Sequence, residues 1–207
     1  MSKMAIIGSG GHAKVVFDAI RMREPNVPIS VFDEYLISSD FWSRCHPEVE
    51  LAPCVDLSSW GNVPFHVAIG DNMVRRSLSA KLAGKGASAF TVIHPRSLVS
   101  PSSSVGRGSF IAAGSIIAAS SYLGEGCIIN HNTCVDHDCA IGDYCHFAPG
   151  SVICGGVRVG SDVLLGAGSV VKPGVKIGDG CVVGAGAVVV SDLCAGSTYA
   201  GVPARKI

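Results

Sequence analysis

The sequence predicts a chain in two parts, a parallel α/β half followed by a parallel β-helix of six-residue repeats. Two observations predict this division. Short apolar runs alternate with helical patterns up to about residue 95, and 19 of the 26 glycines lie beyond that point. An aliphatic residue or Phe then recurs at every sixth position from Val99 to Val189. We therefore expect a boundary near His94-Pro95 and domains at residues 1–95 and 96–207.

The first part shows strands and helices in alternation. The expected elements are strands at 4–7, 29–32 and 65–69, helices at 12–23 and 73–83, and a final strand at 89–93. Gly8-Ser9-Gly10-Gly11 is expected to form a tight turn between the first strand and the first helix. Strands separated by helices in this order predict a parallel sheet with right-handed crossovers.

The second part carries the six-residue period. Sixteen consecutive positions six residues apart are aliphatic or Phe, which excludes a heptad coil and a 3.6-residue helix. Three hexads close one triangular coil of about 18 residues, so the repeat predicts about five coils. The residue four positions after each aliphatic one is nearly always small, because a larger side chain at a corner would clash with the neighbouring coils.

The cysteines follow this repeat. Four of the nine occupy the small corner position: Cys127, Cys139, Cys145 and Cys181. Cys127 and Cys145 are one coil apart, close enough in principle for a disulfide by their expected Cα spacing. No pair has the C-x-x-C spacing of a zinc site, so we expect the thiols to serve packing and no metal to be bound.

Charge and hydropathy exclude several functions. The 16 basic and 16 acidic residues balance, which argues against binding to nucleic acid or to an anionic membrane surface. The apolar run before Gly8 has four residues, too short for a signal peptide core or a membrane span. We expect a cytoplasmic protein with reduced thiols.

Two loops of the first part have the residues of a nucleotide site. Gly8, Gly10 and Gly11 lie between a strand and a helix, where backbone N–H groups can bind a phosphate. Asp33 ends the next strand, where a ribose-binding acid would stand. About 90 residues supply half of a doubly wound sheet, so one mononucleotide is the expected ligand; a purely structural turn is the alternative. The second loop contains Gly70, Asp71 and Asn72.

The histidines of the β-helix are the candidate catalytic groups. His131, His137 and His146 lie within 16 residues, and a β-helix interior of aliphatic residues has no use for imidazole. An imidazole beside a carboxylate suits general base catalysis, and either Asp136 or Asp138 can supply the carboxylate for His137. The spacing places His137 and His146 half a coil apart, so one ligand can touch both only across a subunit boundary, as in a trimer of parallel prisms.

The same segments resemble a known family, the bacterial nucleotide-amino-sugar N-acetyltransferases of the PglD type; the sialic acid O-acetyltransferases of the NeuD type are relatives. The resemblance rests on Gly8-Ser9-Gly10-Gly11-His12, Asp33-Glu34, Ala68-Ile69-Gly70-Asp71-Asn72, Asp136-His137-Asp138 with His146, and Gly201-Val202-Pro203-Ala204-Arg205. It implies a Rossmann-like domain that binds the nucleotide sugar and a left-handed parallel β-helix that trimerises and binds acetyl-CoA.

The resemblance also implies roles for single residues. His137 is then the base that activates the amino group, at C4 of a nucleotide-linked amino-dideoxy sugar for surface glycan synthesis, and Asp138 is its orienting acid. Acetyl-CoA is the cosubstrate. Contacts to it would come from His146, the Gly155 amide and Ala167. Contacts to the nucleotide sugar would come from Gly8, Gly10, Gly11, His12, Asp33, Gly70, Asp71, Asn72 and Asn130. The period independently places Gly155 one coil above His137 on the same face.

Other functions stay open at this point. The pattern does not separate N-acetylation from O-acetylation of the sialic acid type, and it does not choose among UDP, dTDP and GDP sugars. A zinc hydratase of the γ-carbonic anhydrase kind needs three converging histidines, commonly with two of them five residues apart, and here the spacings are six and nine. A non-catalytic sensor of nucleotide sugars is a further alternative, and it predicts no consumption of the thioester.

Overall fold

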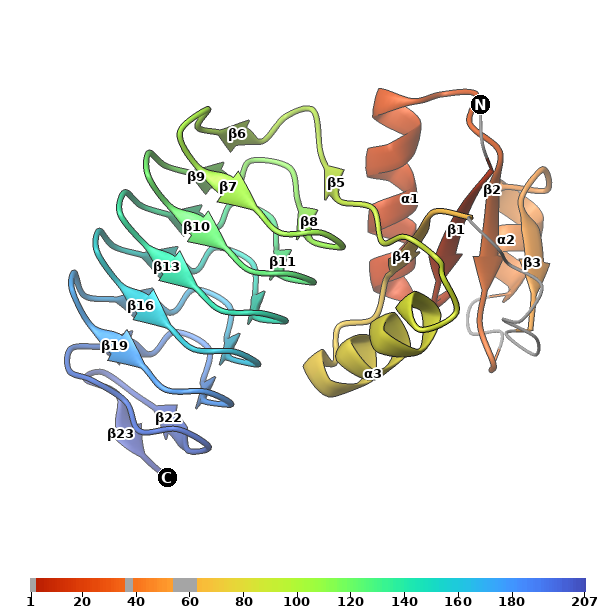
Figure 1. Cartoon of the computed structure of the whole chain (residues 1–207). Helices are drawn as coiled ribbons and strands as arrows, with labels where there is room; N and C mark the ends of the chain where they lie inside the picture. Colours follow the sequence, from red (N-terminus) through yellow and green to blue (C-terminus); the bar gives the residue numbers. More distant parts are fainter. Residues whose placement is uncertain (1–2, 36–38, 54–62) are drawn as a thin grey trace. The chain divides into compact units, whose positions relative to one another are not determined.

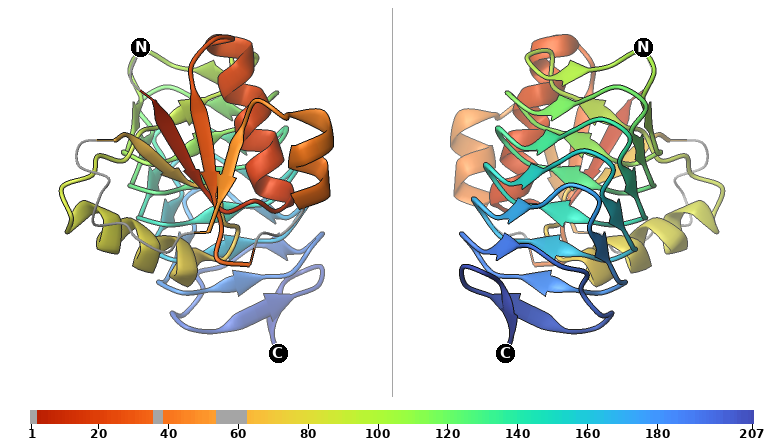
Figure 2. Two further views of the ribbon diagram at one scale, coloured as in Figure 1. Left: turned by 90° about the vertical axis from the view of Figure 1, so that its right-hand side faces the viewer. Right: turned by 90° about the vertical axis from the view of Figure 1, so that its left-hand side faces the viewer.

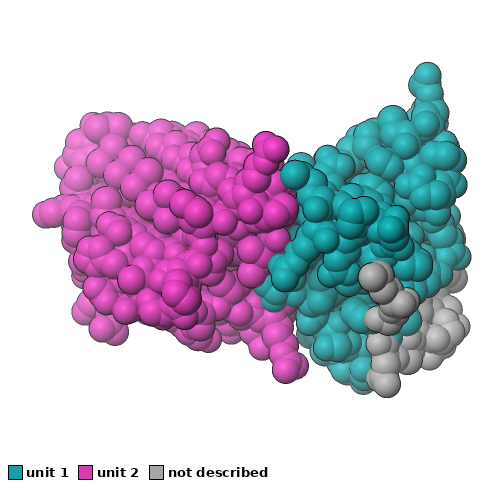
Figure 3. Space-filling model, turned by 90° about the horizontal axis from the view of Figure 1, so that it is seen from above, with its two compact units in different colours: residues 1–92 teal, residues 93–207 magenta. Residues whose placement is uncertain are grey.

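The computed structural model describes residues 3–35, 39–53 and 63–207. The chain forms two compact units, unit 1 (Met1–Val92) and unit 2 (Ile93–Ile207), which Figure 3 colours separately. None of the helices in the described ranges is long and apolar enough to cross a membrane.

Unit 1 is a parallel sheet with helices. Its strands are β1 (Met4–Ile7), β2 (Ile29–Phe32), β3 (Glu50–Ala52) and β4 (Phe65–Val67), and its helices are α1 (Gly11–Arg23), α2 (Ser39–Cys45) and α3 (Asn72–Ala83). The strand order is β3-β2-β1-β4, with parallel pairing throughout, which confirms the predicted parallel sheet. The sequence did not predict α2 and β3. The strand expected at 89–93 is only a bridge from Ala89 to Phe65, followed by the two residues of β5 (Val92–Ile93).

The two longer helices of unit 1 follow from their sequences. Helix α1 buries Ala13, Val16, Phe17, Ala19 and Ile20 on one side. Helix α3 begins at Asp71, whose carboxylate accepts a hydrogen bond from the N–H of Val74 at 2.9 Å, and its C-cap is Gly84. Side-chain capping satisfies an N–H that the first turn of a helix leaves without a partner. Each of these helices follows a strand of the sheet through a short loop, α1 after β1 and α3 after β4, and so begins at the carboxyl edge of the sheet.

Unit 2 is a left-handed parallel β-helix with three faces, whose coils stack along one axis (Figure 1 and Figure 2). Face 1 consists of β6 (Leu98–Val99), β9 (Ile116–Ile117), β12 (Cys134–Val135), β15 (Val152–Ile153), β18 (Val170–Val171) and β21 (Val188–Val189). Face 2 consists of β7 (Ser104–Val105), β10 (Tyr122–Leu123), β13 (Ala140–Ile141), β16 (Arg158–Val159) and β19 (Lys176–Ile177). Face 3 consists of β5, β8 (Phe110–Ile111), β11 (Ile128–Ile129), β14 (His146–Phe147), β17 (Leu164–Leu165), β20 (Val182–Val183), β22 (Thr198–Ala200) and β23 (Arg205–Lys206).

The register of these faces confirms the predicted period. Each strand pairs in parallel with the strand one coil later, as Cys134 pairs with Val152 and Val135 with Ile153. The second residue of each two-residue strand from β8 to β21 points inward and is buried in a continuous core along the prism, and Ile93, Val99 and Val105 of β5, β6 and β7 pack against it partly buried. Only β23 departs from this pattern, because it pairs antiparallel with β22 at the end of the chain.

The small corner residues form hydrogen bonds in addition to avoiding clashes between the coils. Their side chains donate to a backbone carbonyl 15 residues later: Ser109 to Gly124 at 3.1 Å, Ser121 to Asp136 at 2.6 Å, Cys127 to Gly142 at 3.2 Å, Cys139 to Cys154 at 3.2 Å and Cys145 to Gly160 at 3.0 Å. Ser, Thr and Cys therefore share a donor role at the corners, which the steric account from sequence did not include. Cys127 and Cys145 are free thiols and form no disulfide.

Glycines occupy a second kind of corner position, where neighbouring coils approach most closely. A Cβ on Gly142 would lie 2.7 Å from the carbonyl carbon of Gly160, and a Cβ on Gly160 would lie 2.1 Å from the carboxylate of Asp179. That Asp179 carboxylate accepts the N–H of Ser161 at 2.7 Å and so links two coils. The glycines are required here by the space between coils.

Candidate active site

His137 and Asp138 form an exposed acid–imidazole pair at the corner between faces 1 and 2. The Nδ1 atom of His137 lies 2.8 Å from Oδ2 of Asp138, and the His137 side chain is 61% exposed. Asp136 instead accepts the backbone N–H of His137 at 2.7 Å. Asp138 has a left-handed backbone, with φ of 58°, which turns its side chain back toward the preceding imidazole. Of the two neighbouring acids, Asp138 is the one that holds the ring.

This pair changes the protonation of the imidazole. The hydrogen bond that the His137 ring donates to Asp138, together with the negative charge of Asp136, raises the pKa of His137 above its ordinary value of 6.5. A carboxylate on Nδ1 also fixes the tautomer that leaves Nε2 as the proton acceptor when the ring is neutral. His137 can therefore accept a proton through Nε2, which points away from Asp138.

Gly155 lies against the imidazole, one coil above, as the period predicted. A Cβ added to Gly155 would lie 2.6 Å from Cε1 and 2.7 Å from Nε2 of His137, so only glycine leaves the ring its place. The N–H of Gly156 donates to the carbonyl of His137 at 2.9 Å and joins the two corners. Within the part of the chain that the structure describes, the Gly155 N–H donates to no acceptor.

A second group of candidate residues lies at the other edge of face 1. Asn130 and Ala167 stand in turns between faces 3 and 1, and His146 begins β14 on face 3. Nδ2 of Asn130 lies 3.4 Å from Nε2 of His146. The side-chain oxygen of Asn130, Oδ1, accepts a hydrogen bond from the backbone N–H of His131 at 2.9 Å. His137 and His146 are thus on different sides of the prism. The candidate residues fall into two groups that flank face 1.

Two buried side chains hold the glycine turn of unit 1 through hydrogen bonds to Ser9. The N–H and hydroxyl of Ser9 donate to Oδ2 of Asp33 at 2.7 and 2.9 Å, and Nε1 of Trp42 donates to the Ser9 carbonyl at 2.8 Å. Gly8 has φ of 104° and donates its N–H to Phe32. The N–H groups of Gly8 and Ser9 are therefore used within the protein, and the turn continues through Gly10 and Gly11 into the start of α1, where the Nε2 atom of His12 is buried.

The second loop is organised by a buried arginine. Arg75 is 1% exposed and donates to the carbonyls of Ile69 and Gly70 at 2.9 and 3.1 Å and to the side chain of Asn72 at 2.8 Å. Asp71 caps α3. Both loops follow strands that are neighbours in the sheet, β1 and β4, so the carboxyl ends of these strands bring the loops to one edge.

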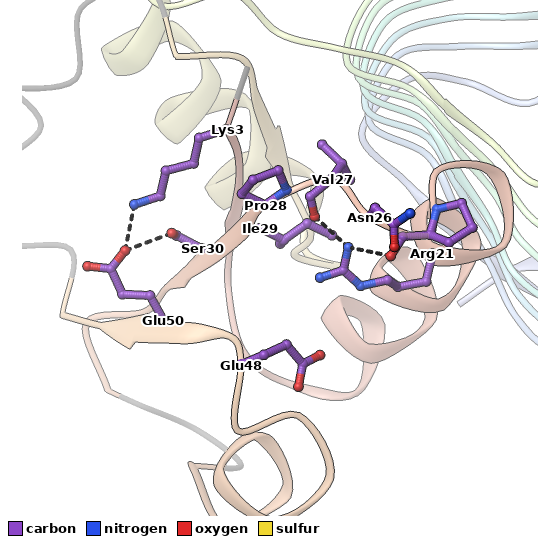
Figure 4. Close-up of a pocket in the computed structure, with 10 residues that line it drawn as sticks. Lys3, Arg21, Asn26, Val27, Pro28, Ile29, Ser30, Glu48 and Glu50 are labelled. Atoms are coloured by element: carbon purple, nitrogen blue, oxygen red, sulfur yellow. Dashed lines mark hydrogen bonds and ion pairs between the residues drawn. The ribbon is translucent and has the colours of Figure 1, made fainter. Parts of the chain in front are cut away.

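Sequence reasoning missed the groups that hold these loops. Trp42 lies in α2, which has no recognisable period, and no sequence pattern indicates that Arg75 is buried and bonded to the Gly70 loop. The hollow shown in Figure 4, about 540 Å³ in volume, lies at the opposite edge of the sheet, where β1, β2 and β3 begin. Its charges are satisfied locally, since Lys3 and Ser30 both donate to Glu50, at 2.6 and 2.8 Å.

Two family models match two different parts of the chain. The model of the PglD N-terminal domain matches residues 3–82, and the model of the bacterial transferase hexapeptide (six repeats) matches residues 120–155 and 156–191. Perosamine N-acetyltransferase PerB of Caulobacter crescentus, solved with CoA and GDP-perosamine, is 38% identical, with a TM-score of 0.90 over 100% of this chain and 98% of that one. The chain belongs to the PglD-type nucleotide-amino-sugar N-acetyltransferases.

Further relatives of this acyltransferase family have the same architecture. The acetyltransferase domain of PglB from Neisseria gonorrhoeae is 31% identical, with a TM-score of 0.89 and full coverage of both chains. It has also been solved with acetyl coenzyme A. The UDP-N-acetylbacillosamine N-acetyltransferase of Bacillus subtilis is 36% identical over 106 residues, which are 48% of this chain and 46% of that protein. The match thus spans about half the length of that curated relative.

Proposed function

We propose that this protein transfers the acetyl group of acetyl-CoA to the C4 amino group of a nucleotide-linked amino-dideoxy sugar, with His137 as the general base. The observation that carries the proposal is the 2.8 Å pair of His137 Nδ1 and Asp138, placed against the Gly155 backbone. Relatives support it. PerB binds CoA and GDP-perosamine, and variants of that enzyme with one histidine replaced by Asn or Ala have been solved with both ligands. The N-acetylated product fits a step in surface glycan synthesis.

The chemistry follows from the position of Nε2. A neutral His137 accepts one proton from the sugar ammonium or from the attacking amine, and the nitrogen forms a bond to the thioester carbonyl carbon. In this proposal the N–H of Gly155 donates to the oxyanion of the tetrahedral intermediate. The C–S bond then breaks, the amide forms, and the leaving CoA thiolate takes the proton from the His137 imidazolium, which returns the ring to its neutral form. Asp138 stabilises the imidazolium that exists between these steps.

We propose further that the active enzyme is a trimer in which face 1 of each copy lies nearest the threefold axis. The outward residues of face 1 are apolar in every coil: Leu98, Ile116, Cys134, Val152, Val170 and Val188. Leu98 is 68% and Ile116 is 39% exposed in the single chain. A continuous apolar stripe of this kind is typical of an interface.

This arrangement assembles the two groups of candidate residues. When face 1 of each copy turns inward, the corner with His137 and Gly155 in one copy meets the edge with Asn130 and His146 in the next. Acetyl-CoA would lie in that cleft, with Ala167 beside it. The hollow on the adjoining face 2, about 600 Å³ in volume, is lined by Arg158 and Lys176, which suit the phosphates of CoA.

The nucleotide sugar is assigned to unit 1. The start of α1 at Gly10, Gly11 and His12 provides backbone donors and a positive helix end for a diphosphate. The Gly70-Asp71-Asn72 loop lies at the same edge of the sheet and can contact the ribose or the sugar. UDP, dTDP and GDP sugars are the compounds with which to identify the nucleotide base.

The decisive experiment is His137→Ala. We expect kcat to fall by ~10²–10⁴, the usual contribution of a general base, while acetyl-CoA still stabilises the protein in a thermal-shift assay. Glu50→Gln, in the hollow at the other edge of the unit 1 sheet, is the control and should keep the wild-type kcat. An unchanged rate in His137→Ala contradicts the proposed base. Mass spectrometry of the product separates N-acetyl from O-acetyl transfer.

The pH profile tests the pair itself. Because the pKa of His137 is raised above 6.5, the acid limb of kcat/KM should lie above pH 6.5. Asp138→Asn removes the main cause of that raised pKa, so the limb should move to lower pH while the maximal rate falls. Asp136→Asn should move the limb less, since Asp136 bonds the backbone N–H and not the ring. Equal shifts in the two variants contradict the assignment of Asp138.

A further inference from the structure

The environment of Asp33 points to a role other than contact with the ribose. An acid at the end of the second strand of such a sheet commonly binds the ribose hydroxyls. Here Oδ2 of Asp33 accepts two hydrogen bonds from Ser9, and Oδ1 accepts the N–H of Tyr35 at 2.8 Å. The side chain is turned inward, and the residue is 9% exposed. Its carboxylate therefore faces the glycine turn and not the solvent at the carboxyl edge of the sheet.

Ser9 is held on its other side by Trp42. Ser9 is completely buried, and Nε1 of Trp42, itself 1% exposed, donates to the Ser9 carbonyl at 2.8 Å. The indole is fixed by Phe17, whose ring is 5.3 Å away in an edge-to-face contact. All three polar groups of Ser9 are thus hydrogen-bonded to two side chains that are remote in sequence: Asp33, which follows β2, and Trp42 of α2.

The conformation of Gly8 explains why Ser9 needs such support. Gly8 has φ of 104°, and a Cβ there would lie 3.0 Å from the carbonyl oxygen of Ala68, so the backbone at Gly8 packs directly against the residue that follows β4. A turn with one glycine in the left-handed region and further glycines on its other side has many alternative conformations. Contacts from outside the turn select one of them: the Gly8 N–H donates to the Phe32 carbonyl, and Ser9 receives the side-chain contacts.

We infer that Asp33 and Trp42 are positioning residues that lock the glycine turn through Ser9, and that Asp33 acts on nucleotide binding only through this lock. The inference rests on the proposed function in placing the nucleotide at Gly10 and Gly11. It adds that the carboxylate at the end of β2 does not read the ribose. Substitutions of Asp33 should therefore behave as changes of the turn.

A double-mutant cycle separates positioning from direct contact. The variants are Ser9→Ala, Asp33→Asn and the two combined. The probe is whichever of UDP, dTDP and GDP stabilises the wild type most, and its Kd is measured by calorimetry. We expect Asp33→Asn to weaken binding about tenfold, the size of one charge-assisted hydrogen bond, and Ser9→Ala to weaken it in the wild-type background but not in the Asp33→Asn background. Equal effects of Ser9→Ala in both backgrounds would mean that Asp33 binds the nucleotide directly.

Trp42→Phe gives an independent arm, because it removes the Nε1 donor and keeps an aromatic ring. It should raise the KM for the nucleotide sugar and leave the KM for acetyl-CoA unchanged. The matched control is the pair at the other edge of the sheet, where Ser30 donates to Glu50 at 2.8 Å. Glu50→Gln and Ser30→Ala should leave both KM values at the wild-type level. A Trp42→Phe enzyme with wild-type KM values overturns the part assigned to Trp42.

Amide hydrogen exchange tests the lock without any ligand. Peptides that cover Gly8 to Ala13 should exchange at least about tenfold faster in Asp33→Asn and Trp42→Phe, and at the wild-type rate in Glu50→Gln. Unchanged exchange in the first two variants overturns the inference. A wild type that binds none of the three nucleoside diphosphates overturns the proposed nucleotide site instead, and the exchange result then still decides whether the lock exists.

Discussion

The two units differ in the regularity of their contacts. In unit 2 each strand contacts the strand one coil later, so Tyr122 pairs with Ala140 and Ala140 with Arg158. In unit 1 the partners follow no fixed spacing: Ala5 pairs with both Ser30 and Phe65, and Trp42 bonds Ser9. One register therefore predicts the contacts of unit 2, whereas unit 1 depends on single contacts without a counterpart. Substitutions in unit 2 should have effects that repeat along the prism, and those in unit 1 should not.

The largest expected effect concerns a single buried group in unit 1. His66 on β4 is buried, its Nδ1 lies 3.1 Å from the Phe90 carbonyl, and burial lowers its pKa to about 4. Because the folded pKa is below the ordinary 6.5, the neutral ring contributes its full stability above pH 6.5, and this is lost as the pH falls toward 4. We expect a loss of roughly 3 kcal/mol in the free energy of unfolding over that range.

Urea unfolding at several pH values measures this loss. Both tryptophans lie in residues 1–92, so their fluorescence reports on unit 1. His66→Gln should flatten the dependence on pH between 6.5 and 4, and His137→Ala should leave it as in the wild type. An equal slope in wild type and His66→Gln would mean that other groups cause the acid sensitivity.

The second effect tests the repeat. Gly142→Ala places a Cβ 2.7 Å from the backbone of Gly160, and neither coil can retreat because each is bonded to the next. We expect a loss of about 2 kcal/mol in the stability of unit 2, the usual cost of overpacking. The same backbone approach recurs one coil earlier, where a Cβ on Gly124 would lie 2.7 Å from the Gly142 carbonyl carbon and would also meet the Asp143 carboxylate, so Gly124→Ala should cost at least as much. Thermal unfolding measured by circular dichroism compares the two variants, and a Gly124→Ala protein as stable as the wild type would contradict the claim that effects repeat.

Gly155 sharpens the comparison because it departs from the repeat. The atoms nearest an added Cβ are those of the His137 ring, which can rotate, and not the backbone. Gly155→Ala should therefore keep the melting temperature within the range of a surface substitution and lower kcat at least about tenfold by displacing the base. Gly142→Ala is the matched variant with the opposite pattern. A Gly155→Ala enzyme that loses stability and keeps its kcat would contradict the proposal that Gly155 leaves room for His137 as the base.

The same contrast explains what the sequence could predict. The interior of the prism, the corner residues and the position of Gly155 beside His137 follow from one period, and the structure has them there. Helix α2 has seven residues and β3 has three, too few for a periodic signal, and so neither was predicted. The bond of Trp42 to Ser9 depends on how these elements pack. The left-handed backbone at Asp138 lies at a hexad position where positive φ recurs, as at Gly126, Gly150 and Gly156, so the period could have marked it. Which acid bonds the ring depends on the direction of the side chain, which the period does not give.

The smallest expected effect concerns the corner thiols. Cys127 is completely buried and donates to the Gly142 carbonyl at 3.2 Å, in the way that Ser109 donates to Gly124 one coil earlier. Cys127→Ser keeps the donor and nearly the volume, so we expect a change within about 0.5 kcal/mol in the free energy of unfolding. Cys127→Leu keeps neither and should cost about 2 kcal/mol by overpacking. Both are measured by urea unfolding followed by circular dichroism, because unit 2 contains no tryptophan. A serine variant as unstable as the leucine variant would show that sulfur itself is required at the corner, and the equivalence of Ser and Cys in the repeat would then be wrong.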